Sequence, residues 1–224
     1  MPSKMDIFKI AGITVDVVLF TIEDGSLRVV LIQRDNEPYH GVRALPGGFM
    51  QENETADAAA ARILREKAGV KDIYTEQLYT FSDLRRDPRG RVISITYFAL
   101  VARDQINFKG SDLQAPALLP MYHLPHLAFD HKQILVYSLE RLRAKLEYTN
   151  IVYSLLTPTF TLTQLQQAYE IILDRKLDKR NFRKKYLSLG LIQATKQFER
   201  GGRRRPAVLY RFKAQEIEQL KKFF

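Results

Sequence analysis

Between residues 46 and 70 the chain combines glycine, glutamate and arginine in a pattern suited to phosphate chemistry. The segment 46–49 reads Pro-Gly-Gly-Phe, and Glu54, Arg62 and Glu66 follow it. Arg62 and Glu66 are one helical turn apart, so their side chains share a helix face. Glutamates on one helix face can hold divalent cations, which stabilise the attack of water on a phosphate. The chemistry to test is therefore the binding or hydrolysis of a phosphate compound.

The same segment resembles the Nudix signature G-x5-E-x7-R-E-U-x-E-E-x-G-U, in which U is a bulky aliphatic residue. With the strands predicted upstream, the resemblance covers roughly residues 10–147. Two glutamates of the signature are missing: Ile63 follows the arginine, and Lys67 replaces the second glutamate of the final pair. The matching positions are Gly48, Glu54, Arg62, Leu64, Glu66, Gly69 and Val70.

These departures remove carboxylates and add a cation, which opposes the binding of a divalent ion, and isoleucine cannot accept a proton from water. We therefore predict no catalytic residues and no cofactor, with at most weak Mg²⁺ binding at Glu54 and Glu66. Glu54 and Arg62 can equally form a salt bridge that braces the loop. The alternative function is an active diphosphohydrolase acting on ADP-ribose or a nucleotide sugar.

A binding pocket can persist without catalysis. The loop 83–90 and the strand after it are similar to a stretch of Nudix proteins that act on or sense ADP-ribose. Arginines there could clamp a diphosphate and aromatic rings could stack a base; alternatively, the arginines are solvated and the rings are core. A lone His131 is more typical of capping or packing. The predicted effector-binding residues are Arg34, Gly47, Gly48, Phe49, Phe81, Arg86, Arg89 and Tyr97.

The charge of the chain is concentrated at one end. Residues 1–150 hold 19 basic and 19 acidic residues, whereas residues 151–224 hold 16 basic and 6 acidic residues and so carry the whole net charge of +10. Such asymmetry favours a polyanionic partner, because clustered cations release counterions from phosphates. The absence of cysteine excludes disulfides and thiolate metal sites, and no segment is apolar enough to span a membrane, so we expect a cytoplasmic protein.

The pattern of residues 1–147 predicts a sheet with two helices. Strands are expected at 13–20, 27–34, 73–81 and 92–101, the first two forming a hairpin around Gly25. Helices are expected at 55–67, ended by Gly69, and at about 131–145, where apolar residues recur every three or four positions.

From residue 148 onward the pattern changes to short helices and a basic hairpin. Helices are expected at 162–173 and 179–189, capped by a threonine at 161 or 163 and by Asp178, and strands at 191–198 and 207–212. This order is typical of a winged helix. We therefore predict an α+β chain in which a Nudix-type α/β/α sandwich with a mixed sheet, residues 1–147, precedes a winged helix-turn-helix domain, residues 148–224.

The helix at 179–189 has a cationic face and an apolar face formed by Phe182, Tyr186 and Leu189, as a helix in the DNA major groove requires. Arginines also cluster at the hairpin tip, where a wing would contact the DNA backbone. Because the aromatic residues interleave as core positions, double-stranded DNA is favoured over RNA, and an RNA-binding module is a further alternative. The predicted DNA-binding residues are Lys179, Arg180, Asn181, Arg183, Lys184, Arg203, Arg204 and Arg205.

Segments 160–166, 178–185 and 209–212 closely resemble the C-terminal domain of the NrtR family of Nudix-related transcriptional regulators. The resemblance implies a homodimer that binds a palindromic DNA operator under the control of an effector, such as ADP-ribose or a sugar phosphate, in the Nudix domain. It also implies a regulator, expected to be a repressor, of genes for NAD synthesis or pentose catabolism.

Overall fold

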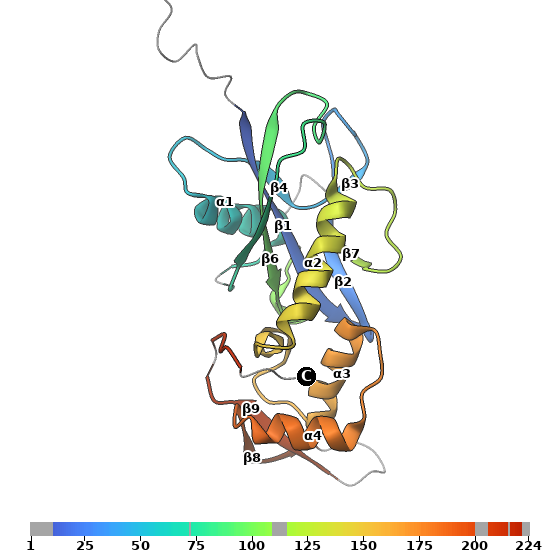
Figure 1. Ribbon diagram of the computed structural model, residues 1–224, viewed down its shortest axis with the longest axis vertical. Coiled ribbons are helices and arrows are strands. Elements are labelled where there is room, and N and C mark those ends of the chain that lie inside the picture. Colours follow the sequence, from blue (N-terminus) through green and yellow to red (C-terminus); the bar gives the residue numbers. More distant parts are fainter. Residues whose placement is uncertain (1–10, 72, 109–115, 200–205, 215, 221–224) are drawn as a thin grey trace, which may run out of the picture. The chain divides into compact units, whose positions relative to one another are not determined.

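The computed structural model describes residues 11–71, 73–108, 116–199, 206–214 and 216–220 (Figure 1). The chain divides into two compact units. The first takes its residues from the stretch up to Leu19, from Val29–Ala99 and from Ile106–Ser138, and the second from Phe20–Arg28, Leu100–Gln105 and the chain from Leu139 onward. The predicted boundary after residue 147 stays a prediction. Among the described helices, none has both the length and the apolar character of a membrane span.

A seven-stranded sheet organises the first part of the chain. Its order is β3 (Arg43–Ala44), β2 (Ser26–Gln33), β1 (Gly12–Glu23), β6 (Val92–Leu100) and β5 (Glu76–Phe81), while β4 (Gly47–Phe49) pairs with β1 and β7 (Ala117–Pro120) with β2. β5 and β6 are antiparallel. β1 and β6 run in the same direction, because Gly12 donates to the Arg91 carbonyl and Val101 to the Phe20 carbonyl. The predicted mixed sheet is confirmed.

The central strand β1 is buried on both faces, from Thr14 through Thr21. A continuous run of buried residues is typical of a strand covered on both sides. Helix α1 (Ala56–Ile63) packs through Ala59, Ala60 and Ile63. Figure 1 shows α1 and the first half of α2 (His131–Lys145) beside the sheet. The predicted bounds of α2 are confirmed.

The helix expected over 55–67 changes character midway. Thr55 caps α1 by accepting from the Ala58 amide, and after Ile63 the chain continues as a π-helical turn, η2 (Leu64–Ala68). π-helical turns redirect the side chains that follow and are frequent at functional sites. Gly69 then ends the helix in the left-handed conformation, with φ +64°, as predicted.

The second unit contains the predicted helix-helix-hairpin order. Its elements are η4 (Ile151–Leu155), α3 (Leu162–Leu173), α4 (Lys179–Ser188), β8 (Ile192–Glu199) and β9 (Ala207–Phe212). Thr161 caps α3 in a reciprocal capping box with Gln164, and the Asp178 carboxylate caps α4. Tyr169 on α3 packs against Phe182 and Tyr186 on α4, with ring centroids 5.3 and 5.8 Å apart.

The conformation of Gly69 gives a prediction about stability. A Cβ atom at Gly69 would lie 1.6 Å from the Asn107 carbonyl oxygen, whereas a Cβ atom at Gly25, which also has positive φ, meets nothing within 4 Å. Gly25→Ala incurs only the left-handed backbone cost of about 1 to 2 kcal/mol. We expect Gly69→Ala to lower the melting temperature of the full chain at least twice as far as Gly25→Ala, measured by circular dichroism. Equal shifts would contradict this account.

Candidate functional site

A cavity of about 200 Å³ opens in the first unit between β1, β4, η2 and the loop before β6. Six of the eight predicted effector-binding residues line it: Arg34, Gly47, Gly48, Phe49, Arg86 and Arg89. The predicted effector-binding set did not include Asp16, Lys67, Phe129 and His131, which line it too. Asp16 had a usable signal, since an acidic residue inside an apolar strand must find a buried partner or a function.

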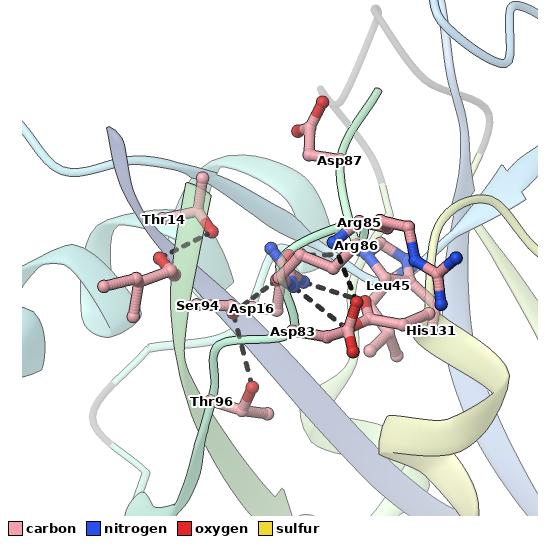
Figure 2. Close-up of polar contacts among 12 residues, drawn as sticks. Thr14, Asp16, Leu45, Asp83, Arg85, Arg86, Asp87, Ser94, Thr96 and His131 are labelled. Carbon is pink, nitrogen blue, oxygen red and sulfur yellow. Dashed lines mark hydrogen bonds and ion pairs between the residues drawn. The ribbon is translucent and has the colours of Figure 1, made fainter. Parts of the chain in front are cut away.

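Asp16 lines the cavity and belongs to the polar network drawn in Figure 2. Its Oδ2 accepts a hydrogen bond of 2.6 Å from Ser94 Oγ and lies 3.5 Å from an Arg86 nitrogen. Gly47 is opposite Asp16 in the β1–β4 register, and a Cβ atom there would lie 2.0 Å from Asp16 Oδ1. Glycine at 47 is therefore required for the β4 backbone to approach this carboxylate.

The Arg86 guanidinium is engaged by a carboxylate of the protein itself. Its Nε and Nη2 donate hydrogen bonds of 2.9 and 2.8 Å to the two oxygens of Asp130, and only 4% of its side chain is exposed. The paired geometry is the strong bidentate form of an arginine–carboxylate interaction. Arg86 thus braces the cavity floor, while its clamping of a diphosphate stays a prediction.

His131, at the first turn of α2, also lines the cavity. Its Nδ1 accepts a 2.9 Å hydrogen bond from the Leu45 amide, and its Nε2 lies 3.8 Å from Asp16 Oδ1. Burial lowers its pKa below the ordinary value, so the ring is neutral with its proton on Nε2. The bond to the Leu45 amide fixes His131 in the cavity wall, and its capping or packing role stays a prediction.

Two arginines and two phenylalanines form the mouth of the cavity. The Arg34 guanidinium lies 4.7 Å from the Phe129 ring centroid, and that of Arg89 lies 5.4 Å from Phe49 and 5.6 Å from Phe129. Burial, followed by the nearby charge of Arg89, lowers the pKa of Arg34. A cationic rim that is partly withdrawn from water favours an anionic ligand.

Phe81 and Tyr97 are not brought to this cavity. The ring centroid of Phe81 lies 5.3 Å from that of Tyr79 and 6.0 Å from that of Tyr137. The Tyr97 hydroxyl donates a 2.6 Å hydrogen bond to Asp57 Oδ1, and burial followed by this bond raises the pKa of Tyr97. The rings that face the cavity are Phe49 and Phe129 instead. Sequence spacing could not distinguish these rings from core aromatics.

The remaining acids of the motif are held by Arg62. The Arg62 Nη2 and Nε atoms donate bonds of 2.6 and 2.9 Å to the two oxygens of Glu54, and its Nη1 lies 3.4 Å from Glu66 Oε2. The hydrogen bonds that Arg62 donates to Glu54 lower the pKa of Glu54 to about 2. The predicted salt bridge between Glu54 and Arg62 is confirmed. Ile63 is fully buried.

Helix α4 presents a cationic surface in the second unit. Lys179, Arg180, Asn181 and Lys184 are exposed, whereas Phe182 and Tyr186 are buried. Arg183 is half-buried, and its Nη2 donates a 3.1 Å hydrogen bond to Thr163 Oγ1. The division into an exposed polar face and an apolar face is as predicted. The predicted contacts at Arg203, Arg204 and Arg205 lie outside the described residues.

Comparison with known proteins assigns both halves of the chain. The NUDIX domain model matches residues 12–137, and the model of the NrtR DNA-binding winged helix domain matches residues 152–212. The crystal structure of Shewanella oneidensis NrtR complexed with a 27mer DNA is 35% identical, covers 90% of this chain and 93% of that chain, and has a TM-score of 0.81. These matches confirm the predicted fold class.

The NUDIX domain of that protein, complexed with ADP ribose, is 37% identical and covers 61% of this chain and 92% of that chain, with a TM-score of 0.56. An ADP-ribose pyrophosphatase of Methanocaldococcus jannaschii is 37% identical over 108 residues, which are 48% of this chain and 63% of that protein. The ADPR responsive transcriptional repressor NtrR of Acinetobacter baylyi is 39% identical over 220 residues, 92% of this chain and 83% of that protein. Since this last similarity spans both units, the chain belongs to the NrtR family, in which a Nudix domain precedes a DNA-binding winged helix domain.

Proposed function

We propose that this chain is a transcriptional repressor that binds ADP-ribose in the cavity of its first unit and operator DNA through α4. One observation carries the proposal: Arg34, Lys67 and Arg89 line the cavity, while Arg62 occupies the motif's remaining glutamates. Such a site can bind a diphosphate, while the two motif glutamates that metal-assisted hydrolysis would use are engaged by Arg62. The repressor from Acinetobacter baylyi, described as ADPR responsive, supports the choice of ligand.

Helix α2 contributes residues to both units. It begins at the cavity, where His131 lines the wall and Asp130 holds Arg86. Its residues from Leu139 onward belong to the second unit, where Arg143 Nε donates a 2.9 Å hydrogen bond to the Ile172 carbonyl on α3. A ligand that contacts the loop of Arg86 and Arg89 can therefore bias α2, provided that it binds one arrangement better than the other.

We also propose that the active form is a homodimer on a palindromic operator, with NAD-synthesis or pentose-catabolism genes as targets. The family membership supports this, because a two-fold symmetric protein matches a two-fold symmetric site.

DNA binding tests the proposal directly. In a mobility-shift assay with the promoter region of its own gene, we expect a specific retarded complex that requires two half-sites in the DNA. We expect ADP-ribose to dissociate this complex. Arg180→Ala should weaken binding about tenfold and lower the slope of log affinity against log salt by about 1, because it removes one exposed contact to a phosphate. Lys71→Ala, which removes an exposed cation from the first unit, is the matched control. Equal affinity for bulk DNA would refute the proposal.

The mouth of the cavity is tested by Arg89→Ala. Because the Arg89 guanidinium lies over two rings at the rim, we expect ADP-ribose to bind about ten- to a hundredfold more weakly in isothermal titration calorimetry. Arg85→Ala removes an exposed arginine from the same loop that does not line the cavity and should leave affinity unchanged. The same loss in both variants would point to general charge rather than to the site.

Hydrolysis separates the repressor from the diphosphohydrolase alternative. With ADP-ribose and magnesium, we expect chromatography to detect no more AMP from the wild type than from Glu66→Gln, since Arg62 already engages the Glu54 and Glu66 carboxylates. Steady AMP release that Glu66→Gln abolishes would establish the enzyme instead.

A further inference from the structure

We propose that Lys67 is a diphosphate-binding residue whose ammonium supplies the positive charge that a Nudix hydrolase takes from divalent metal, so that the effector binds without metal. This inference rests on the proposed function and goes beyond it, because it names the residue that replaces the metal. It depends on three features of the first unit: the motif acids, the position of Lys67 and the charge around it.

The motif acids do not fit a divalent ion. Both Glu54 oxygens accept hydrogen bonds from Arg62, and Oε1 also accepts from the Gln51 amide at 2.7 Å. Glu66 is half exposed and lies between Arg62 and Arg65, 3.4 and 3.9 Å from their nitrogens. In the part of the chain that the structure describes, no three His, Cys, Asp or Glu side chains are grouped to hold a metal ion. Divalent cations bind oxygen ligands that are free to coordinate, and here arginine side chains already engage the glutamate oxygens.

Lys67 points from the π-helical turn into the cavity rather than to solvent. Its Nζ donates a 2.5 Å hydrogen bond to the Gly47 carbonyl, and the side chain lines the cavity beside Gly47 and Gly48. Its neighbour Glu66 is exposed. Of the motif's charged residues, Lys67 is therefore the one directed into the cavity, next to the glycine strand that borders the ligand space.

Lys67 uses only part of its hydrogen-bonding capacity within the described residues, and the charges of two acids, Asp16 and Glu66, act on it. An ammonium has three donor hydrogens, and within the described residues Lys67 uses one, on the Gly47 carbonyl. Asp16, the acid whose charge acts most strongly on it, already accepts from Ser94 and lies beside Arg86. Burial lowers the pKa of Lys67, and the Arg34 cation adds to this effect. A phosphate in the cavity would supply both the acceptors and the negative charge.

Calorimetric titration of the full-length protein tests the inference, with ADP-ribose as the probe in magnesium chloride or in EDTA and sodium pyrophosphate as a second probe in EDTA, because magnesium itself binds pyrophosphate. We expect wild-type affinity for ADP-ribose to be the same in both buffers. Lys67→Met, which keeps the chain length and removes the charge, should weaken binding about ten- to a hundredfold, the worth of a charged hydrogen bond. Arg65→Met, two residues away and exposed, removes the same charge outside the cavity and should bind like wild type.

The outcomes separate this inference from the proposed function. A wild type that binds ADP-ribose only with magnesium, or a folded Lys67→Met variant that binds as tightly as wild type, overturns the role of Lys67 and leaves the repressor in place. Binding of pyrophosphate but not ADP-ribose, lost in Lys67→Met, supports Lys67 and overturns the effector. Failure of the wild type to bind either probe overturns both. A melting curve for each variant establishes that it is folded.

Discussion

A buried cluster of opposite charges beneath the cavity is the constraint on which the first unit depends. Arg86, from the loop between β5 and β6, joins Asp130 at the start of α2 to Asp16 on β1. Three segments that are far apart in the sequence meet at one guanidinium. Removing one partner of such a buried pair typically costs about 3 to 5 kcal/mol, because the other charge is left unpaired. The cavity above it is therefore held in shape before any ligand binds.

The rim of the cavity and the face of α4 use positive charge differently. At the rim, arginines lie against the Phe49 and Phe129 rings, so their charge is fixed in position and partly withdrawn from water. On α4 the side chains of Lys179, Arg180 and Lys184 extend into solvent, while Phe182 and Tyr186 attach the helix to α3. Fixed cations favour one ligand geometry, whereas solvated cations can follow a DNA backbone by counterion release.

Local signals account for the elements that were predicted well. The bounds of α2, α3 and β9 followed from apolar periodicity, caps and the charge pattern, because these are properties of neighbouring residues. The short strands β3, β4 and β7 were not predicted, since a strand of two to four residues carries no periodic pattern and forms only where a partner strand is already present. The π-helical turn after Ile63 likewise had no sequence signal.

For the site, the resemblance to the Nudix signature predicted a diphosphate pocket without a complete set of metal ligands, because Ile63 and Lys67 stand where the signature has glutamates. The residue types also separated a neutral part, residues 1–150, from a cationic part, residues 151–224. The folded chain was needed to show that Arg86 is occupied by Asp130, that Tyr97 bonds Asp57, and that Lys67 turns inward. These outcomes depend on which distant partner each polar group meets, and burial allows a charge to remain only where such a partner is found.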